Sequence, residues 1–354
     1  MRVLVWQWGR KGAGPRYAAA LAASLATVPG TSSALSLSSS AEILQGEDAP
    51  DCALPFRTYG GITSFLVRFA SIPFALPGLF RRLRALAPDV AICAMPAALD
   101  IAMVLALRWV GVPFHVVVHD ADAHPGDRIP VQMILQHRLI RSADGVIALS
   151  AHVAARLRAI GLPRHQKLVL TELPPLMFGT PPAPPGTHGG RLRLLSFGRL
   201  LPYKGLGLLA DAMHALGPRD DVELRVVGQG PPSPELEALA RLPHVTVENR
   251  WVPEGEVGAL LAWSDALVLS HTEASQSGVA AVAIAARRFV VATSVGGIIE
   301  QLRDEPLARL CAPDAPALAG AIAGLISDPP RETGHKDPSA VWHDVATRLV
   351  QDLG

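Results

Sequence analysis

Short apolar runs alternate with longer helix-like runs along the first half of the chain. Strands that are apolar throughout, such as FHVVVH at 114–119, must be covered on both faces, which is typical of parallel sheets built from β-α-β units. The strands predicted from these runs are Arg2–Trp6, Val90–Cys93, Phe114–His119, Val146–Ser150 and Leu168–Leu173. The predicted helices between them are Pro15–Ala26, Ala98–Trp109 and Val131–Ile140.

A stretch rich in proline and glycine, residues 172–190, interrupts this alternation and is typical of a linker. A second alternation follows it. Its predicted strands are Leu192–Phe197, Val222–Val227, Val245–Glu248, Ala266–Leu269 and Val290–Thr293, and its helices are Leu206–Leu216, Glu235–Leu242, Glu254–Trp263 and Gly278–Arg287. We therefore predict two α/β domains, over 1–175 and 191–337, joined by a linker over 176–190.

The last residues repeat an apolar side chain at every fourth position. Val341, Val345, Leu349 and Leu353 predict an amphipathic helix over 338–354. Two alternatives remain for its apolar side, which packs either on the second domain or back on the first.

Composition narrows the class of protein. Apolar residues make up 49% and the net charge is +1, which excludes a disordered chain and argues against a dedicated nucleic-acid binder. Cys52, Cys93 and Cys311 include no CxxC pair, so we expect neither a disulfide framework nor a zinc site. The chain shows no signal-peptide pattern and no uninterrupted apolar run of about 18 residues, so we expect a cytoplasmic location.

Two cations flank the beginning of a predicted helix in the second half. Arg199 follows Gly198 at the end of a predicted strand, and Lys204 lies five residues later. A helix N-terminus favours anions, and an arginine binds phosphate through two hydrogen bonds, so the pair suits a diphosphate. The alternative is an ordinary surface arginine and a lysine beside a helix.

A second polar segment follows the predicted strand 266–269. Glu273 stands on a loop suited to accept sugar hydroxyls, and the small residues after it expose backbone N–H groups. The alternative is a helix capped by Ser277 with a solvated Glu273. Gly296 and Gly297 form a further turn that permits close backbone approach.

Together these segments resemble the GT-B glycosyltransferases of family 4, a retaining family that uses nucleotide sugars. The matching motifs are G-R-x4-K-G at 198–205, VVGQGP at 226–231, E-x-S-x-S-G at 273–278, VVAT-x-VGG at 290–297 and VIALSAHVAARL at 146–157. The resemblance implies an α/β fold of the GT-B type, with two Rossmann-like domains that face each other across a cleft. It also implies a last helix that returns to the first domain.

The resemblance assigns roles to individual residues. Arg199 and Lys204 would bind the donor diphosphate, and Glu273 would contact the transferred sugar. The backbone of the neighbouring loops would complete the donor site, through Gly198, Ser275, Gln276, Ser277, Gly278 and Val279. The family's second glutamate, which holds the ribose, falls on Ala281 or Val282 here, and neither side chain can accept a hydrogen bond.

The first domain offers candidates of its own. By the same resemblance the loop at Gly12 and Gly14 would lie near the donor phosphates, whereas the pattern alone favours a tight strand–helix turn. His119 ends a predicted strand and would approach the transferred sugar, with His124 as the weaker candidate.

A metal site is the rival interpretation of the same segment. Asp120 and Asp122 form a D-x-D pattern, which in GT-A glycosyltransferases holds a divalent metal and the donor diphosphate. The cations of the second half argue against this alternative. We therefore expect no metal and no other cofactor beyond the donor substrate.

Residues 62–84 combine four phenylalanines with a run of arginines that ends at Arg84. The segment suits either the surface of an anionic membrane or core packing of helices broken at Pro73 and Pro77.

The sequence thus predicts a retaining glycosyltransferase of polysaccharide or glycolipid assembly. It would transfer a sugar from a nucleotide-diphosphate donor to a glycan or lipid-linked glycan, in the cytoplasm or peripherally on the inner face of its membrane. A nucleotide-sugar 2-epimerase and a non-catalytic partner of another glycosyltransferase are the alternatives.

Overall fold

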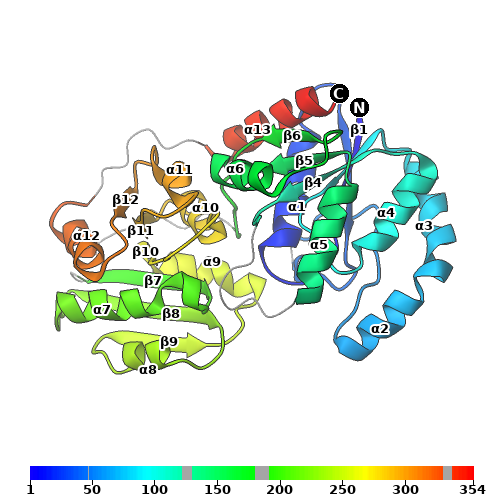
Figure 1. Ribbon diagram of the computed structural model, residues 1–354. Coiled ribbons are helices and arrows are strands. Elements are labelled where there is room, and N and C mark those ends of the chain that lie inside the picture. Colours follow the sequence, from blue (N-terminus) through cyan, green and yellow to red (C-terminus); the bar gives the residue numbers. More distant parts are fainter. Residues whose placement is uncertain (47, 122–129, 180–190, 330–336) are drawn as a thin grey trace. The chain divides into compact units, whose positions relative to one another are not determined.

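The computed structural model describes residues 1–46, 48–121, 130–179, 191–329 and 337–354. Two compact units divide the described chain (Figure 1). Of the described residues, unit 1 comprises 1–121, 130–172 and 339–354, and those from Leu173 to Pro338 belong to unit 2. Most of the predicted linker, residues 180–190, lies outside the described residues.

Unit 1 contains a six-stranded sheet in which each neighbouring pair is parallel, in the order β2-β1-β3-β4-β5-β6. Its strands are β1 (Arg2–Gln7), β2 (Ser32–Leu37), β3 (Val90–Cys93), β4 (Phe114–Val118), β5 (Gly145–Ala148) and β6 (Lys167–Leu170). Its helices are α1 (Ala13–Leu25), the short η1 (Glu42–Gln45), α2 (Ile62–Ala70), α3 (Ile72–Leu86), α4 (Asp100–Val110), α5 (Pro130–Ser142), α6 (Ala151–Ile160) and α13 (Pro338–Leu353).

Unit 2 repeats this architecture with the order β12-β11-β10-β7-β8-β9. Its strands are β7 (Leu192–Arg199), β8 (Val222–Gln229), β9 (Val245–Asn249), β10 (Ala266–Leu269), β11 (Phe289–Thr293) and β12 (Ala308–Cys311). Its helices are η2 (Pro202–Lys204), α7 (Leu206–Leu216), α8 (Pro234–Ala240), α9 (Glu254–Trp263), α10 (Gly278–Ala285), α11 (Ile298–Leu302) and α12 (Ala315–Ser327). The predicted pair of Rossmann-like α/β domains is confirmed.

Each sheet is buried on both faces, as the apolar strands required. In unit 2 Leu194 and Val226 pack with Leu209 of α7 and Ile322 of α12 in one core. The next side chains along the strands point to the opposite face, where α9 and α10 contact the sheet. This double covering leaves the strand ends as the places where polar loops gather.

The last helix belongs to unit 1. Trp342 of α13 lies 5.4 Å from the ring of Tyr17 on α1. Arg348 donates a hydrogen bond to the carboxylate of Glu172 over 2.7 Å. Val345 and Leu349 are fully buried. The apolar side of α13 therefore completes the core of unit 1 beside α1.

The segment 62–84 differs from the prediction in where its helices end. The chain breaks at Ser71 between α2 and α3, and α3 continues through Pro77. Pro73 fits the first turn of α3, where a backbone N–H has no helical partner to lose. Among the described residues no single helix is long and apolar enough to cross a membrane, and only the pair of α2 and α3, bent by 67°, meets the length and composition criteria together.

Candidate functional site

Three polar segments of unit 2 meet at one edge of its sheet. The strands β7, β10 and β11 are neighbours, and each predicted donor-binding segment begins where one of them ends. Because all three strands are parallel, their carboxyl ends share an edge. The fold therefore brings Arg199, Lys204 and the loop after Glu273 to the same side of unit 2.

The two predicted cations share one aromatic ring. The guanidinium carbon of Arg199 lies 5.5 Å from the ring centroid of Tyr203, and Nζ of Lys204 lies 5.3 Å from it. Tyr203 is 5% exposed, so its ring is a fixed support for both charges. Nζ of Lys204 also lies 2.8 Å from Nε2 of His271, which follows β10. Two positive charges are thus concentrated above the end of β7.

Hydrogen bonds to two backbone carbonyls hold the lysine segment against the end of β10. The hydroxyl of Ser270 donates to the carbonyl of Lys204 over 2.8 Å, and the N–H of Thr272 donates to the carbonyl of Tyr203 over 3.0 Å. Gly205 adopts φ +66°, and a Cβ there would lie 1.8 Å from the carbonyl oxygen of Ser270. Only glycine fits this crossing, which fixes the position of the lysine relative to β10.

The loop from Glu273 to Ser277 is fastened from the other side. Gly297 donates its N–H to the carbonyl of Ala274 over 3.0 Å. The amide of Gln301 accepts from the N–H of Ser277 and donates to its carbonyl, each over 3.0 Å. The Ser277 hydroxyl accepts the N–H of Ala280 and caps α10, as the structural alternative predicted. Glu273 itself is exposed at the end of this pinned loop.

Close packing of glycines places the end of β7 beside the first turn of α10. Gly198 adopts φ +117°, and a Cβ on it would lie 3.4 Å from a methyl group of Val279. A Cβ on Gly228 of β8 would lie 1.7 Å from the carbonyl oxygen of Gly198. The backbone therefore requires glycine at 198 in the G-R motif, for its positive φ, and at 228 in the VVGQGP motif, for the close approach of the two strands, independently of any ligand.

In unit 1 the corresponding edge carries His119. Its Nε2 donates to the carbonyl of Ala94 over 3.1 Å, and its ring meets that of Tyr17 edge-on at 5.2 Å. Burial lowers the pKa of His119 below its usual 6.5, so the imidazole is neutral at pH 7. Gly12 begins α1 with φ +81°, and a Cβ on Gly14 would lie 3.2 Å from the sulfur of Met95.

A buried carboxyl that the sequence analysis did not single out lies below this edge. Asp100 is 2% exposed at the start of α4, and burial raises its pKa to about 7. Its Oδ2 accepts the N–H of Ala97 over 2.6 Å and lies 3.5 Å from the sulfur of Cys93. An aspartate that opens an apolar helix was the only sequence signal available.

Comparison with known families decides the class. Residues 12–171 match the model described as "Glycosyl transferase 4-like domain", and residues 191–328 match "Glycosyl transferases group 1". The two matches cover both units in the expected order. The chain belongs to the GT-B glycosyltransferases of family 4.

Solved structures share the fold of this glycosyltransferase. Sucrose-phosphate synthase from Thermosynechococcus elongatus is 17% identical, with 99% of this chain and 98% of that chain covered and a TM-score of 0.68. Anabaena HepE, in complex with UDP and glucose, is 15% identical, with coverages of 99% and 95% and a TM-score of 0.67. The UDP-GlcNAc 2-epimerase of Neisseria meningitidis is 12% identical, with coverages of 100% and 99% and a TM-score of 0.60. No curated protein matches the chain.

The position at which the family has its second glutamate is buried in this glycosyltransferase. Ala281 is 0% exposed and Val282 is 3% exposed, and the carbonyl of Ala281 accepts the N–H of Leu176. Both residues belong to the interior of unit 2. A glutamate introduced at either position would therefore be buried inside unit 2.

Asp122, the second aspartate of the possible metal site, lies outside the described residues, as does His124. Within the part of the chain that the structure describes, no group of three or more His, Cys, Asp or Glu side chains could hold a metal ion. His271 is the residue of the donor-side group that sequence reasoning missed, although it lies two positions before Glu273.

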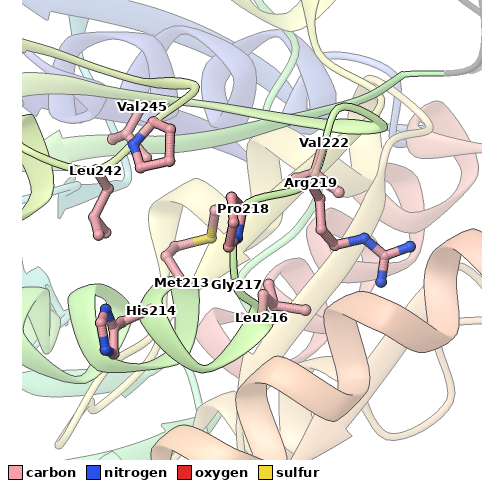
Figure 2. Close-up of a pocket in the computed structure, with 10 residues that line it drawn as sticks. Met213, His214, Leu216, Gly217, Pro218, Arg219, Val222, Leu242 and Val245 are labelled. Carbon is pink, nitrogen blue, oxygen red and sulfur yellow. The ribbon is translucent and has the colours of Figure 1, made fainter.

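A pocket of about 290 Å³ lies at the opposite edge of the second sheet (Figure 2). It lies between the end of α7 and the first residues of β8 and β9, with Met213, Leu216, Val222 and Val245 in its lining. The predicted donor-binding residues lie at the carboxyl ends of the strands, so this mainly apolar pocket at the amino ends is separate from them.

Proposed function

We propose that this glycosyltransferase transfers a sugar from a nucleotide-diphosphate sugar to a hydroxyl of a glycan or lipid-linked glycan, with retention of anomeric configuration. The observation that carries the proposal is the pair of cations at Tyr203. Arg199 and Lys204 are both within 5.5 Å of its ring centroid at the carboxyl edge of the sheet. The complex of Anabaena HepE with UDP and glucose supports a nucleotide sugar as the donor class.

The charges match the demands of the reaction. Cleavage of the anomeric C–O bond places negative charge on the departing diphosphate and positive charge on the sugar ring. Arg199 and Lys204 stabilise the developing negative charge, and they need no reorganisation because Tyr203 and the Gly205 crossing already hold them. We therefore propose that transfer needs no metal ion.

The loop from Glu273 to Ser277 supplies the remaining contacts to the donor. Glu273 accepts hydroxyl hydrogen bonds of the transferred sugar, and the backbone of Ser275, Gln276, Ser277 and Gly278 meets the donor. Gln301 holds that backbone through two hydrogen bonds to Ser277. For unit 1 we assign donor contacts to Gly12, Gly14 and His119.

The acceptor class and the place of action are inferred together. A lipid-linked glycan would require the enzyme to work at the inner face of the cytoplasmic membrane, in polysaccharide or glycolipid assembly. The bent pair of α2 and α3 exposes apolar side chains suited to such a location.

Donor hydrolysis in the absence of acceptor tests the proposal. UDP-, GDP-, ADP- and TDP-sugars are first screened by thermal shift, and each stabilising donor is then incubated with the protein, with and without EDTA. We expect one donor class to release its nucleoside diphosphate and free sugar, and expect Lys204→Ala to slow the release by about 10²-fold or more. Conversion of the donor to its 2-epimer would favour the epimerase alternative, and binding without turnover, with or without added acceptor glycolipid, would favour a non-catalytic partner. Loss of turnover in EDTA that Mn²⁺ restores would favour a metal site at Asp120.

A further inference from the structure

The outer surface of α2, α3 and α4 concentrates the exposed apolar side chains of the molecule. Eight of the twelve large apolar side chains that are exposed among the described residues lie on these consecutive helices. They are Ile62, Leu66, Val67 and Phe69 of α2, Phe74 of α3, and Ile101, Leu105 and Trp109 of α4, and we call them the α2–α4 surface. A concentration of this kind marks a contact with another apolar body.

Helix α2 has no buried residue at all. It is held through Phe65, which packs against the core and meets Tyr59 at 5.0 Å. Ile62 is 83% exposed and Leu66 is 60% exposed. Helix α2 therefore exposes an apolar face to solvent, although its other side packs on unit 1.

Helices α3 and α4 continue the surface. Phe74 at the start of α3 is 86% exposed. The rings of Phe80 and Trp109 pack at a tilt of 37° with their centroids 4.6 Å apart and join the two helices, which are drawn side by side in Figure 1. Leu105 and Trp109 lie on the outer side of α4, whereas Met103 and Leu107 fill the core.

The charged residues of the segment that carries α2 and α3 have one sign. Residues 52–88 contain five arginines and no lysine, aspartate or glutamate. Arg81 and Arg84 are exposed on α3, and Arg84 lies 5.7 Å from the ring of Phe80. Apolar side chains bordered by arginines suit a layer of anionic phosphates above hydrocarbon. Two copies of the same surface would instead bring like charges together.

We propose that the α2–α4 surface binds an anionic phospholipid bilayer, with α2 and Phe74 at the boundary between headgroups and acyl chains. The arginines then lie at the level of the phosphates. Because α3 buries Leu79 and Leu83 in the core of unit 1, the helix pair lies on the membrane and does not cross it. The inference deepens the proposed function and rests on it for the acceptor that the membrane would present.

Vesicle co-sedimentation of the full chain tests the binding. The probes are vesicles of phosphatidylcholine alone and of phosphatidylcholine with about 30% phosphatidylglycerol, a content that gives an anionic surface. We expect binding to the anionic vesicles and weak or no binding to the neutral ones. Phe74→Ser and Leu66→Ser should each reduce the partition coefficient about tenfold through lost apolar insertion. The double variant Arg81→Glu and Arg84→Glu should reduce the partition coefficient by a similar factor and remove the salt dependence of vesicle binding.

A matched control comes from Ile160→Ser, since Ile160 is 44% exposed on α6, outside this surface. It should bind vesicles as the wild type does, and thermal unfolding should show all variants folded. Equal binding to neutral and anionic vesicles, or unchanged binding of Phe74→Ser, would overturn the proposal. A protein that binds no vesicles but forms a dimer, which Phe74→Ser dissociates, would also overturn the proposal. Donor hydrolysis is measured without lipid, so any of these results leaves the transfer proposal standing.

Discussion

The ammonium nitrogen of Lys204 lies 2.8 Å from Nε2 of His271. An ammonium group only donates, so Nε2 accepts and the imidazole is neutral with its proton on Nδ1. Thr293 fixes the backbone of His271 by donating its hydroxyl to the carbonyl over 2.6 Å. His271 therefore orients the lysine that we assign to the donor diphosphate.

Replacing His271 should impair that orientation. We expect His271→Leu to lower kcat/KM about 10- to 100-fold, the usual cost of losing a group that orients a ligand-binding residue. His271→Gln keeps an acceptor and should retain more activity. Steady-state kinetics, with melting temperatures as a check on folding, would measure this. Equal losses in both variants would assign His271 a packing role only.

The cations themselves should matter more for turnover than for stability. Lys204→Ala and Arg199→Ala should each lower kcat by about 10²-fold or more, roughly 2.7 kcal/mol of transition-state stabilisation. Arg241→Ala is a suitable control, because Arg241 forms only an exposed pair with Glu237 on α8. Near-normal turnover in both site variants would contradict the assignment.

Glu273 should act on the sugar and not on the nucleotide. Glu273→Gln keeps the shape of an exposed loop residue but weakens charge-assisted bonds that contribute roughly 1.5–3 kcal/mol each. We expect a large fall in kcat/KM with the donor while calorimetry finds nearly unchanged affinity for the free nucleoside diphosphate. A parallel loss of both would place Glu273 on the nucleotide.

Ribose recognition should be weak. Helix α10, with the sequence GVAAVAIA, contains no Asp or Glu and so offers no carboxylate to ribose hydroxyls. We expect donors with 2′-deoxyribose to be used with a kcat/KM within about tenfold of the ribose donors, less than the loss caused by an unpaired buried polar group. Rejection of deoxyribose donors by about 10³-fold would reveal another residue that binds the ribose.

The buried Asp100 predicts a pH dependence of stability. Its pKa of about 7 in the folded protein exceeds its ordinary value of 3.8, so the folded state holds the proton more tightly. The contribution of Asp100 to the free energy of unfolding is fully present below pH 4. It is lost as the pH rises through 7, by up to about 1.4 kcal/mol per pH unit. Asp100→Asn should therefore raise the free energy of unfolding relative to wild type more at pH 8 than at pH 5. Chemical denaturation at the two pH values measures the difference, and a constant difference would contradict a raised pKa.

The sequence predicted most strands because each contains a run of apolar residues. The edge strands β2 and β12 were missed, since serines interrupt SSALSL and an arginine interrupts the short ARLC. Arg199, Lys204 and Glu273 were predictable from motif spacing. The contact of His271 with Lys204 joins residues 67 positions apart, and only the strand order brings them together.

The return of α13 to unit 1 has a consequence for synthesis. Unit 2 is covalently an insertion between Glu172 and Ser339, so it is synthesised before the last helix of unit 1. Until Trp342, Val345 and Leu349 are made, the core beside α1 lacks its cover. Unit 1 therefore cannot complete its core until all of unit 2 has been synthesised, whereas unit 2 needs no segment made after Pro338.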